Sequence, residues 1–281
     1  MTTRYQRRLW TNRIGLCFSS LAMAIGLAAL AWILWTLFYN GLSAFSANLF
    51  VESTPAPGTD GGGLANAIVG SLMMVAVSTL VATPIGVLAG IYLAEYGQKS
   101  RFAAITRFVN DIMLSAPSIV IGLFVYAIAV ATFRQFSGWA GSLALTLIAV
   151  PVIVRTTENM LNLVPGGLRE AAFALGAPRW KVNVSIALRA VKGGIVTGIL
   201  LAVARIIGET APLLFTALNN QFFSTDMSKP MANLPVVIYN FALSPYASWQ
   251  ELAWGGAALI ALIVLTINII ARTVFRDKVR D

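Results

Sequence analysis

Histidine is absent from the 281-residue sequence, and cysteine occurs once, as Cys17. Without histidine there is no Ser-His-Asp triad and no histidine-based zinc site, and a single cysteine cannot build a disulfide framework. The sequence also lacks the Gly-x-x-x-x-Gly-Lys-[Ser/Thr] loop with which many ATPases hold phosphate. The chain by itself is therefore expected to be no enzyme, to carry no catalytic residues and to bind no metal ion or other cofactor.

Charged residues are scarce as well. They make up 11% of the chain, and hydrophobic residues make up 58%, whereas a soluble domain has about 25% charged residues. This composition is typical of an integral membrane protein, which contacts membrane lipid. The net charge of +9 does not indicate a nucleic-acid partner, because the basic residues are spread between apolar segments and form no single basic face.

Six apolar segments have the length and composition of membrane-spanning helices, which need about 20 residues to cross a bilayer core. They are Ile14–Tyr39, Leu64–Ala94, Ile112–Phe133, Gly138–Val154, Gly193–Leu218 and Leu252–Ala271. Pro84 predicts a kink in the second of them. The sequence thus predicts an all-α polytopic membrane protein with six transmembrane helices.

The distribution of lysine and arginine predicts how these helices are oriented. Of the 20 such residues, only Arg134 and Lys229 fall in segments expected outside, and only Arg205 falls within a span. Because lysine and arginine concentrate in cytoplasmic segments, we predict a multi-pass inner-membrane protein. Both termini and the loop at residues 165–192 are expected in the cytoplasm.

The chain is expected to have three parts. Residues 1–63 would form a basic tail, the first transmembrane helix and an external loop that ends in a glycine-rich run. Residues 64–272 would form a core of five transmembrane helices that includes the 165–192 loop. Residues 273–281 would form a second basic tail. Two connecting segments are expected to be loops, a charged one at 95–107 and a polar external one at 219–248.

The 165–192 loop contains a polar, basic segment, Glu170–Arg189, with the pattern of two short helices and a tight turn. Gly176 lies where a left-handed residue would end the first helix, and Pro178 suits the first turn of the second. Each helix has one apolar stripe at helical spacing, and Arg169 and Phe173 are expected to point away from the first stripe. The stripes are Leu168, Ala171, Ala172 and Leu175, and Trp180, Val184, Leu188 and Val191.

This segment resembles the coupling loop of ABC-transporter permeases, in which Glu-Ala-Ala, three residues, Gly, nine residues and Ile-x-Leu-Pro follow one another. Arg189 stands where that family has proline, which leaves open where the second helix ends. The resemblance implies that a separate ATPase, which binds ATP and Mg²⁺, docks on this loop. The residues expected to couple to it, with Phe173 as the packed anchor, are Glu170, Ala171, Ala172, Phe173 and Gly176.

Arg205 lies inside the fifth apolar segment. If that helix begins near Gly193, Arg205 lies about 18 Å into a bilayer core of about 30 Å. A charge at this depth costs at least about 2.5–3.5 kcal/mol, so it needs a partner or a cavity. Glu209, four residues later, would share its helix face. The two form either an ion pair that stabilises packing or a site for an oxyanion, whose oxygens fit the planar guanidinium. We interpret Arg205, Glu209 and Thr210 as residues of a substrate pathway.

The sequence Arg-x-x-Gly-Glu-Thr-Ala-Pro at 205–212 resembles the phosphate-specific ABC-transporter permeases, and the segment Leu114–Gly122 is similar to them too. The sequence at 208–214 resembles the PstA type among them. The resemblance implies a MetI-like importer core and inorganic phosphate as the substrate. It also implies a complex with a PstC-type permease, a dimer of a PstB-type ATPase and a PstS-type phosphate-binding protein.

Two alternatives remain open on the sequence. A permease for another oxyanion, such as sulfate or molybdate, would share every feature except the 205–212 sequence. A secondary transporter with Glu209 as a proton relay would work without ATP and would need no coupling loop.

Overall fold

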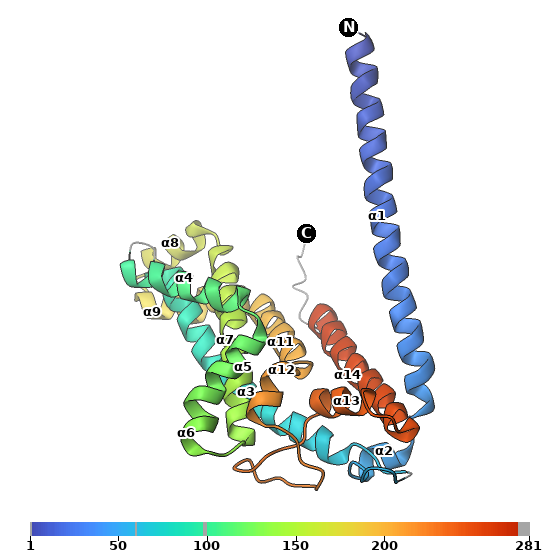
Figure 1. The fold of residues 1–281 in the computed structure, drawn as a ribbon. Helices are drawn as coiled ribbons and strands as arrows, with labels where there is room; N and C mark the ends of the chain where they lie inside the picture. Colours follow the sequence, from blue (N-terminus) through green and yellow to red (C-terminus); the bar gives the residue numbers. More distant parts are fainter. Residues whose placement is uncertain (1, 60, 98–99, 275–281) are drawn as a thin grey trace.

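The computed structural model describes residues 2–59, 61–97 and 100–274 (Figure 1). Every regular element within these ranges is helical, so the predicted all-α class is confirmed. The basic C-terminal tail lies, from residue 275 on, outside the described residues, as do Asp60 and Lys99. The division of the chain near residues 59–63 stays a prediction.

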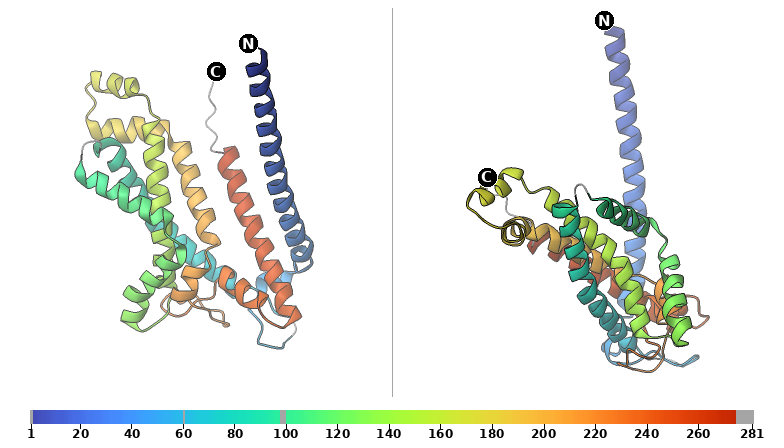
Figure 2. Two further views of the ribbon diagram at one scale, coloured as in Figure 1. Left: turned by 45° about the horizontal axis from the view of Figure 1, so that its top comes forward. Right: turned by 90° about the vertical axis from the view of Figure 1, so that its left-hand side faces the viewer.

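The first helix, α1 (Thr2–Ser43), runs apart from the rest of the chain for most of its length (Figures 1 and 2). The basic N-terminal residues, predicted as a tail, continue this helix without a break. Its 42 residues rise about 63 Å, roughly twice the thickness of a bilayer core. It packs on α14 (Ala247–Val274), with the backbone of Gly41 against Trp254 and Ala258.

The remaining helices form a bundle around α3 (Ala65–Ile91) and α7 (Gly138–Asn162), which pack on each other along most of their lengths. The π-helix η1 (Tyr92–Tyr96) extends α3. The bundle is completed by α5 (Ser118–Val125), η2 (Tyr126–Val130), α6 (Ala131–Phe133), α11 (Lys192–Ile207), α12 (Ala211–Thr216) and α14.

Within the described residues, the helices that could cross a membrane overlap the six predicted spans. Four of them are long and apolar enough by themselves: Arg4–Ser43, Ala65–Tyr96, Gly138–Asn162 and Ala247–Thr273. Two bent pairs bring the number to six if each is one span. One pair joins α4 (Arg101–Ser115) to Ser118–Phe133 at 106°, and the other joins Arg179–Ala190 to α11 at 72°.

The third predicted span, Ile112–Phe133, is wrong as a single helix. The chain turns at Ala116 and Pro117, whose backbones are extended, because proline disfavours the helical conformation in the residue before it. The predicted charged loop at 95–107 is also wrong in its second half, which is helical from Arg101. Helix α4 exposes one apolar stripe, formed by Phe102, Ile105, Phe108, Val109 and Ile112.

The segment predicted as the external loop 219–248 contains a helix, α13 (Leu234–Ala242), which the polar composition of its surroundings concealed. It begins at Asn233, whose side chain accepts a hydrogen bond from the amide of Val236. The hydroxyl of Ser71 on α3 accepts a further bond from the amide of Leu234 at 2.8 Å. The segment predicted as the first external loop likewise contains a short helix, α2 (Ala47–Val51). These contacts tie the loops at this end of the bundle to α3.

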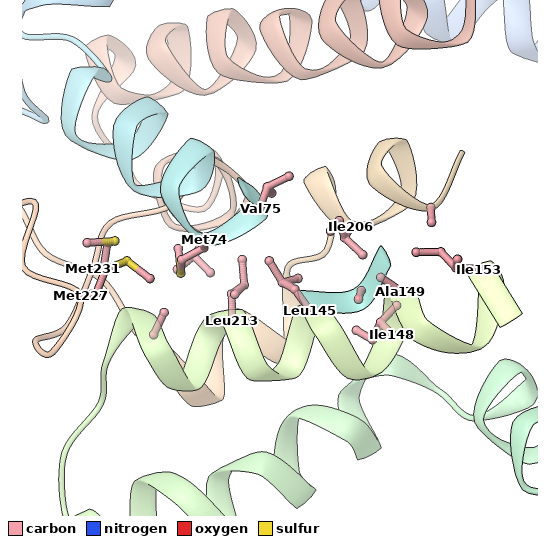
Figure 3. Packing of buried hydrophobic residues seen from close by; sticks show 14 residues of the cluster. Met74, Val75, Leu145, Ile148, Ala149, Ile153, Ile206, Leu213, Met227 and Met231 are labelled. Atoms are coloured by element: carbon pink, nitrogen blue, oxygen red, sulfur yellow. The ribbon is translucent and has the colours of Figure 1, made fainter. Parts of the chain in front are cut away.

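The main apolar core lies between α3, α7, α11 and α12 (Figure 3). Met74, Leu145, Ile153 and Ile206 are almost completely buried in it. Helices α3 and α7 approach closely because α3 presents glycine at the contact. A Cβ atom on Gly86 would lie 2.7 Å from the Cβ of Ile153. Small residues of this kind let membrane helices pack backbone to backbone.

This close contact predicts the effect of a larger side chain. Gly86→Leu is expected to destabilise the folded protein by about 1–3 kcal/mol, because the added atoms overlap α7. Gly26→Leu on α1 is the matched control, since a Cβ atom there meets no atom within 4 Å. Both variants gain the same helix propensity, so the difference between their thermal midpoints in detergent isolates the packing effect. Equal midpoints would contradict the packing of α3 on α7.

Candidate functional site

The fifth predicted span, Gly193–Leu218, is broken in two at the residues singled out in the sequence. Helix α11 ends at Ile207, and α12 begins after Thr210. Gly208 and Glu209 lie between them, outside either helix. Pro212 occupies the first turn of α12. Backbone N–H groups in a first turn have no acceptor within the helix, so the N–H that proline lacks costs no hydrogen bond there. The Gly-Glu-Thr-Ala-Pro sequence therefore interrupts the helix within the span.

The structure brings Arg205 and Glu209 together, although not on one helix face as predicted. The Nε of Arg205 lies 3.7 Å from the Oε1 of Glu209, so the charges are close but form no direct hydrogen bond. The arginine side chain is 43% exposed and that of the glutamate 15%. The guanidinium consequently has donors that Glu209 does not occupy.

Two further observations describe this place in the span. Arg205 is the 14th residue of α11, about 20 Å along the helix from its start at a rise of 1.5 Å per residue. Thr210 precedes α12, and its side chain makes no capping hydrogen bond. The break thus brings a cation and a carboxylate close together, and Thr210 follows them directly in the chain.

The 165–192 loop folds into short helices, as predicted. They are α8 (Gly166–Ala174), α9 (Arg179–Val182), the π-helix η3 (Asn183–Ala187) and α10 (Leu188–Ala190). Gly176 has a φ of 78°. Its amide donates to the carbonyl of Phe173, and the amide of Ala177 donates to that of Ala172, at 2.9 and 3.2 Å. This is the Schellman motif that ends a helix at a left-handed glycine. The second helix, whose end the sequence left open, stops at Ala190, and Val191 alone separates it from α11.

The apolar stripes predicted for this loop are mostly exposed. Of the first stripe only Ala172 is buried, and Trp180 and Val184 of the second are 64% and 52% exposed. Phe173 is 44% exposed, in agreement with its predicted outward position. Glu170 and Ala171 are exposed too. The loop therefore presents an apolar surface at the end of the molecule that also carries both termini of the described chain (Figures 1 and 2).

The prediction that Arg169 points outward is wrong. Its Nη2 lies 2.7 Å from the Oε1 of Glu95 on η1, and the two side chains are only 21% and 10% exposed. The guanidinium also donates to the carbonyl of Leu161 in the last turn of α7 and to that of Val164 just after the helix. Spacing within the loop could not indicate these partners, because they belong to other helices.

A second charged cluster was missed in the sequence. Arg107 on α4 donates to Glu158 on α7 at 2.6 Å, and Glu158 is 5% exposed. Arg155, which the sequence placed in a loop, lies on α7 instead, 3.8 Å from Asp111 and 4.0 Å from Glu158. The i, i+3 spacing of Arg155 and Glu158 was the one local signal. Within the described residues, no group of three metal-ligating side chains occurs.

The fold and the broken, charged span together define a polytopic membrane transport protein. Residues 86–277 match the family described as binding-protein-dependent transport system inner membrane component. Two similar proteins are the phosphate transport system permease protein PstA of Yersinia pestis, 57% identical over 99% of this chain and 95% of its own length, and that of Haemophilus influenzae, 59% identical over 98% and 97%. The chain belongs to the PstA family of phosphate transport system permease proteins, and it is a multi-pass inner-membrane protein.

Solved structures agree with this fold. One chain of the MetNI methionine ABC transporter, in an inward-facing conformation, aligns with a TM-score of 0.63 at 20% identity over 75% of this chain and 93% of its own. A chain of the bacterial alginate ABC transporter, in complex with a periplasmic protein, aligns with a TM-score of 0.59 at 16% identity over 96% and 99%. The predicted MetI-like permease fold is confirmed.

Proposed function

We propose that this chain is the permease subunit of an ATP-driven importer of inorganic phosphate. The observation that carries the proposal is the Arg205–Glu209 pair at the break in the fifth span, in a chain whose 57–59% identical relatives are named phosphate transport system permeases. An arginine held at this depth has no structural reason to be nearly half exposed unless it faces a partner or a polar passage.

The chemistry of the pair suits a phosphate ion. A planar guanidinium donates two parallel hydrogen bonds to an oxyanion, and it stays charged at every physiological pH. Glu209 lies close enough to lower the net positive charge of the site, and it could accept a hydrogen bond from a protonated phosphate. The hydroxyl of Thr210 offers a further donor. Together these groups would offset the desolvation of the anion, which is large in an apolar medium.

The energy for transport would come from another subunit. We assign the binding of ATP and Mg²⁺ to a PstB-type ATPase dimer, with the exposed surface of the 165–192 loop as its docking site. A PstC-type permease would form the other half of the pathway, and a PstS-type protein would deliver phosphate from outside. ATP-driven closure of the ATPase would displace the loop and alternate access to the Arg205 site. The chain itself would not be an enzyme.

The alternatives are less well supported. A role in sulfate or molybdate import is less well supported, because relatives that match almost the whole chain are named for phosphate transport. A secondary transporter would have no use for an apolar loop surface that the chain's own helices leave uncovered. Uptake measurements decide between them. In vesicles that contain all four proteins, labelled phosphate should accumulate only with ATP, and sulfate should not compete. Uptake in ATP-depleted, energised vesicles would contradict the proposal.

The proposed topology predicts which sites an impermeant thiol reagent reaches. In a Cys17→Ser background, Thr59→Cys should be labelled in cells with a permeable outer layer, because the 41–63 loop would lie outside. Leu175→Cys, at an 89% exposed position of the 165–192 loop, should be labelled only after the membrane is opened. The reverse pattern would invert the topology and exclude this loop as an ATPase contact.

A further inference from the structure

The five residues of η1, at the end of α3, receive side-chain hydrogen bonds from three other elements. Arg169 of α8 bonds to Glu95 at 2.7 Å, and Asn183 of η3 donates to the hydroxyl of Tyr96 at 3.1 Å. Arg107 of α4 donates to the carbonyl of Leu93 at 2.7 Å. Both helical parts of the 165–192 loop are therefore joined to one short turn of another helix.

The ion pair is the strongest of these contacts on chemical grounds. Glu95 and Arg169 are mostly shielded from solvent, and a charge-assisted hydrogen bond is roughly twice as strong as a neutral one. The π-helical winding of η1 makes the backbone locally wider than an α-helix. Such turns are rare and frequently lie at functional sites.

The same two arginines extend the connection from η1 to α7. Arg169 donates to the carbonyls of Leu161 and Val164 at the end of α7, and Arg107 donates to Glu158 within it. Helices α3 and α7 are the pair that pack most extensively in the core. A displacement of the 165–192 loop is thus applied, through hydrogen-bonded contacts, to the ends of both helices.

We propose that η1 is the element that receives the movement of the 165–192 loop and passes it to α3 and α7, with Arg169 and Glu95 as the positioning residues of this link. The proposal rests on the function proposed above, because it requires an ATPase that moves the loop. It separates two tasks within α8. Phe173 and its exposed neighbours bind the ATPase, whereas Arg169, on the inner side, transmits its movement.

The test uses Glu95→Gln, which removes the charge pair and leaves the bonds from Arg169 to the α7 carbonyls in place. In the complete complex, reconstituted with the ATPase and binding protein, we expect the ATPase to co-purify at wild-type yield. Phosphate uptake should fall by about tenfold, a typical coupling effect. ATP hydrolysis should continue, so more ATP is consumed per phosphate. Glu251→Gln, which neutralises an exposed carboxylate of α14 outside the 165–192 loop, is the matched control and should behave as the wild type.

Two further variants keep the outcome decisive. Glu95→Ala combined with Arg169→Ala should transport no less than Arg169→Ala alone, because both act through one contact. Tyr96→Phe, which removes a single hydroxyl, should lower uptake in the same direction by about twofold to fivefold, and it tests the link even if the Glu95 variants do not insert. Wild-type coupling in Glu95→Gln and Tyr96→Phe, or loss of the ATPase from them, overturns the proposal. Absence of uptake by the wild-type complex would instead contradict the proposed function.

Discussion

Replacing Arg205 with alanine is expected to abolish phosphate uptake while the chain still reaches the membrane. Without the guanidinium, the site loses the positive charge that offsets the desolvation of the anion, and the neutral hydroxyl of Thr210 cannot replace that charge. Arg205→Lys keeps the charge but loses the planar guanidinium that donates two parallel hydrogen bonds, so uptake should fall strongly without vanishing. The measurement is initial phosphate uptake per inserted permease, with the ATPase and the binding protein present.

A double replacement separates transport from packing. If Arg205 and Glu209 form only a structural ion pair, Arg205→Met combined with Glu209→Leu removes both charges at similar volume and should restore a stable, active protein. If Arg205 supplies charge to the passing anion, the double variant folds but does not transport. We expect the second result. Near-normal uptake by the double variant would place the substrate site elsewhere.

Phe173→Asp is expected to reduce ATP-driven uptake by more than tenfold, because it puts a charge into the centre of an apolar contact where hot-spot residues are commonly worth at least about 2 kcal/mol. The ATPase should be recovered at lower yield with this variant, while insertion into the membrane is unchanged. Phe173→Leu, which keeps most of the apolar area, should retain most of the activity.

The matched control for this prediction is Leu163→Asp. Leu163 is 70% exposed and lies at the end of α7, outside the helices of the 165–192 loop, so the same charge there should leave ATPase binding intact. Normal co-purification of the ATPase and normal uptake with Phe173→Asp would show that the complex is held together by other contacts.

The transmembrane helices were predictable because few backbone structures can cross a bilayer. Every backbone group in lipid must bond within the chain, so a long apolar run such as Ile14–Tyr39 is read reliably as a helix. The turn at Gly176 was predictable for a local reason too, since only the residues on either side of it determine a left-handed helix end. Neither inference needs knowledge of distant contacts.

Two of the predictions that failed concern features set by residues far away in the sequence. The helix α13 is held by Ser71, more than 160 residues earlier in the sequence, and the direction of Arg169 is set by Glu95 and by carbonyls of α7. The turn before α5 had a signal in Pro117, but a proline within an apolar run predicts a kink as readily as a 106° bend. The proximity of Arg205 and Glu209 was predicted, whereas the helix break between them was not.

The break in the fifth span has a mechanical consequence. Helix α11 packs on α7 and α14 and follows the 165–192 loop after a single residue, whereas α12 packs on α5 and α7. Residues 208–210 therefore connect two half-spans that share α7 as a neighbour but differ in the other, α14 for the first and α5 for the second. If the 165–192 loop moves as proposed, its displacement acts directly on α11, whereas α12 is held by its own contacts with α5. Arg205 lies on α11 and Glu209 lies within the 208–210 connection, so a change in the angle between the two half-spans would change the distance between their side chains.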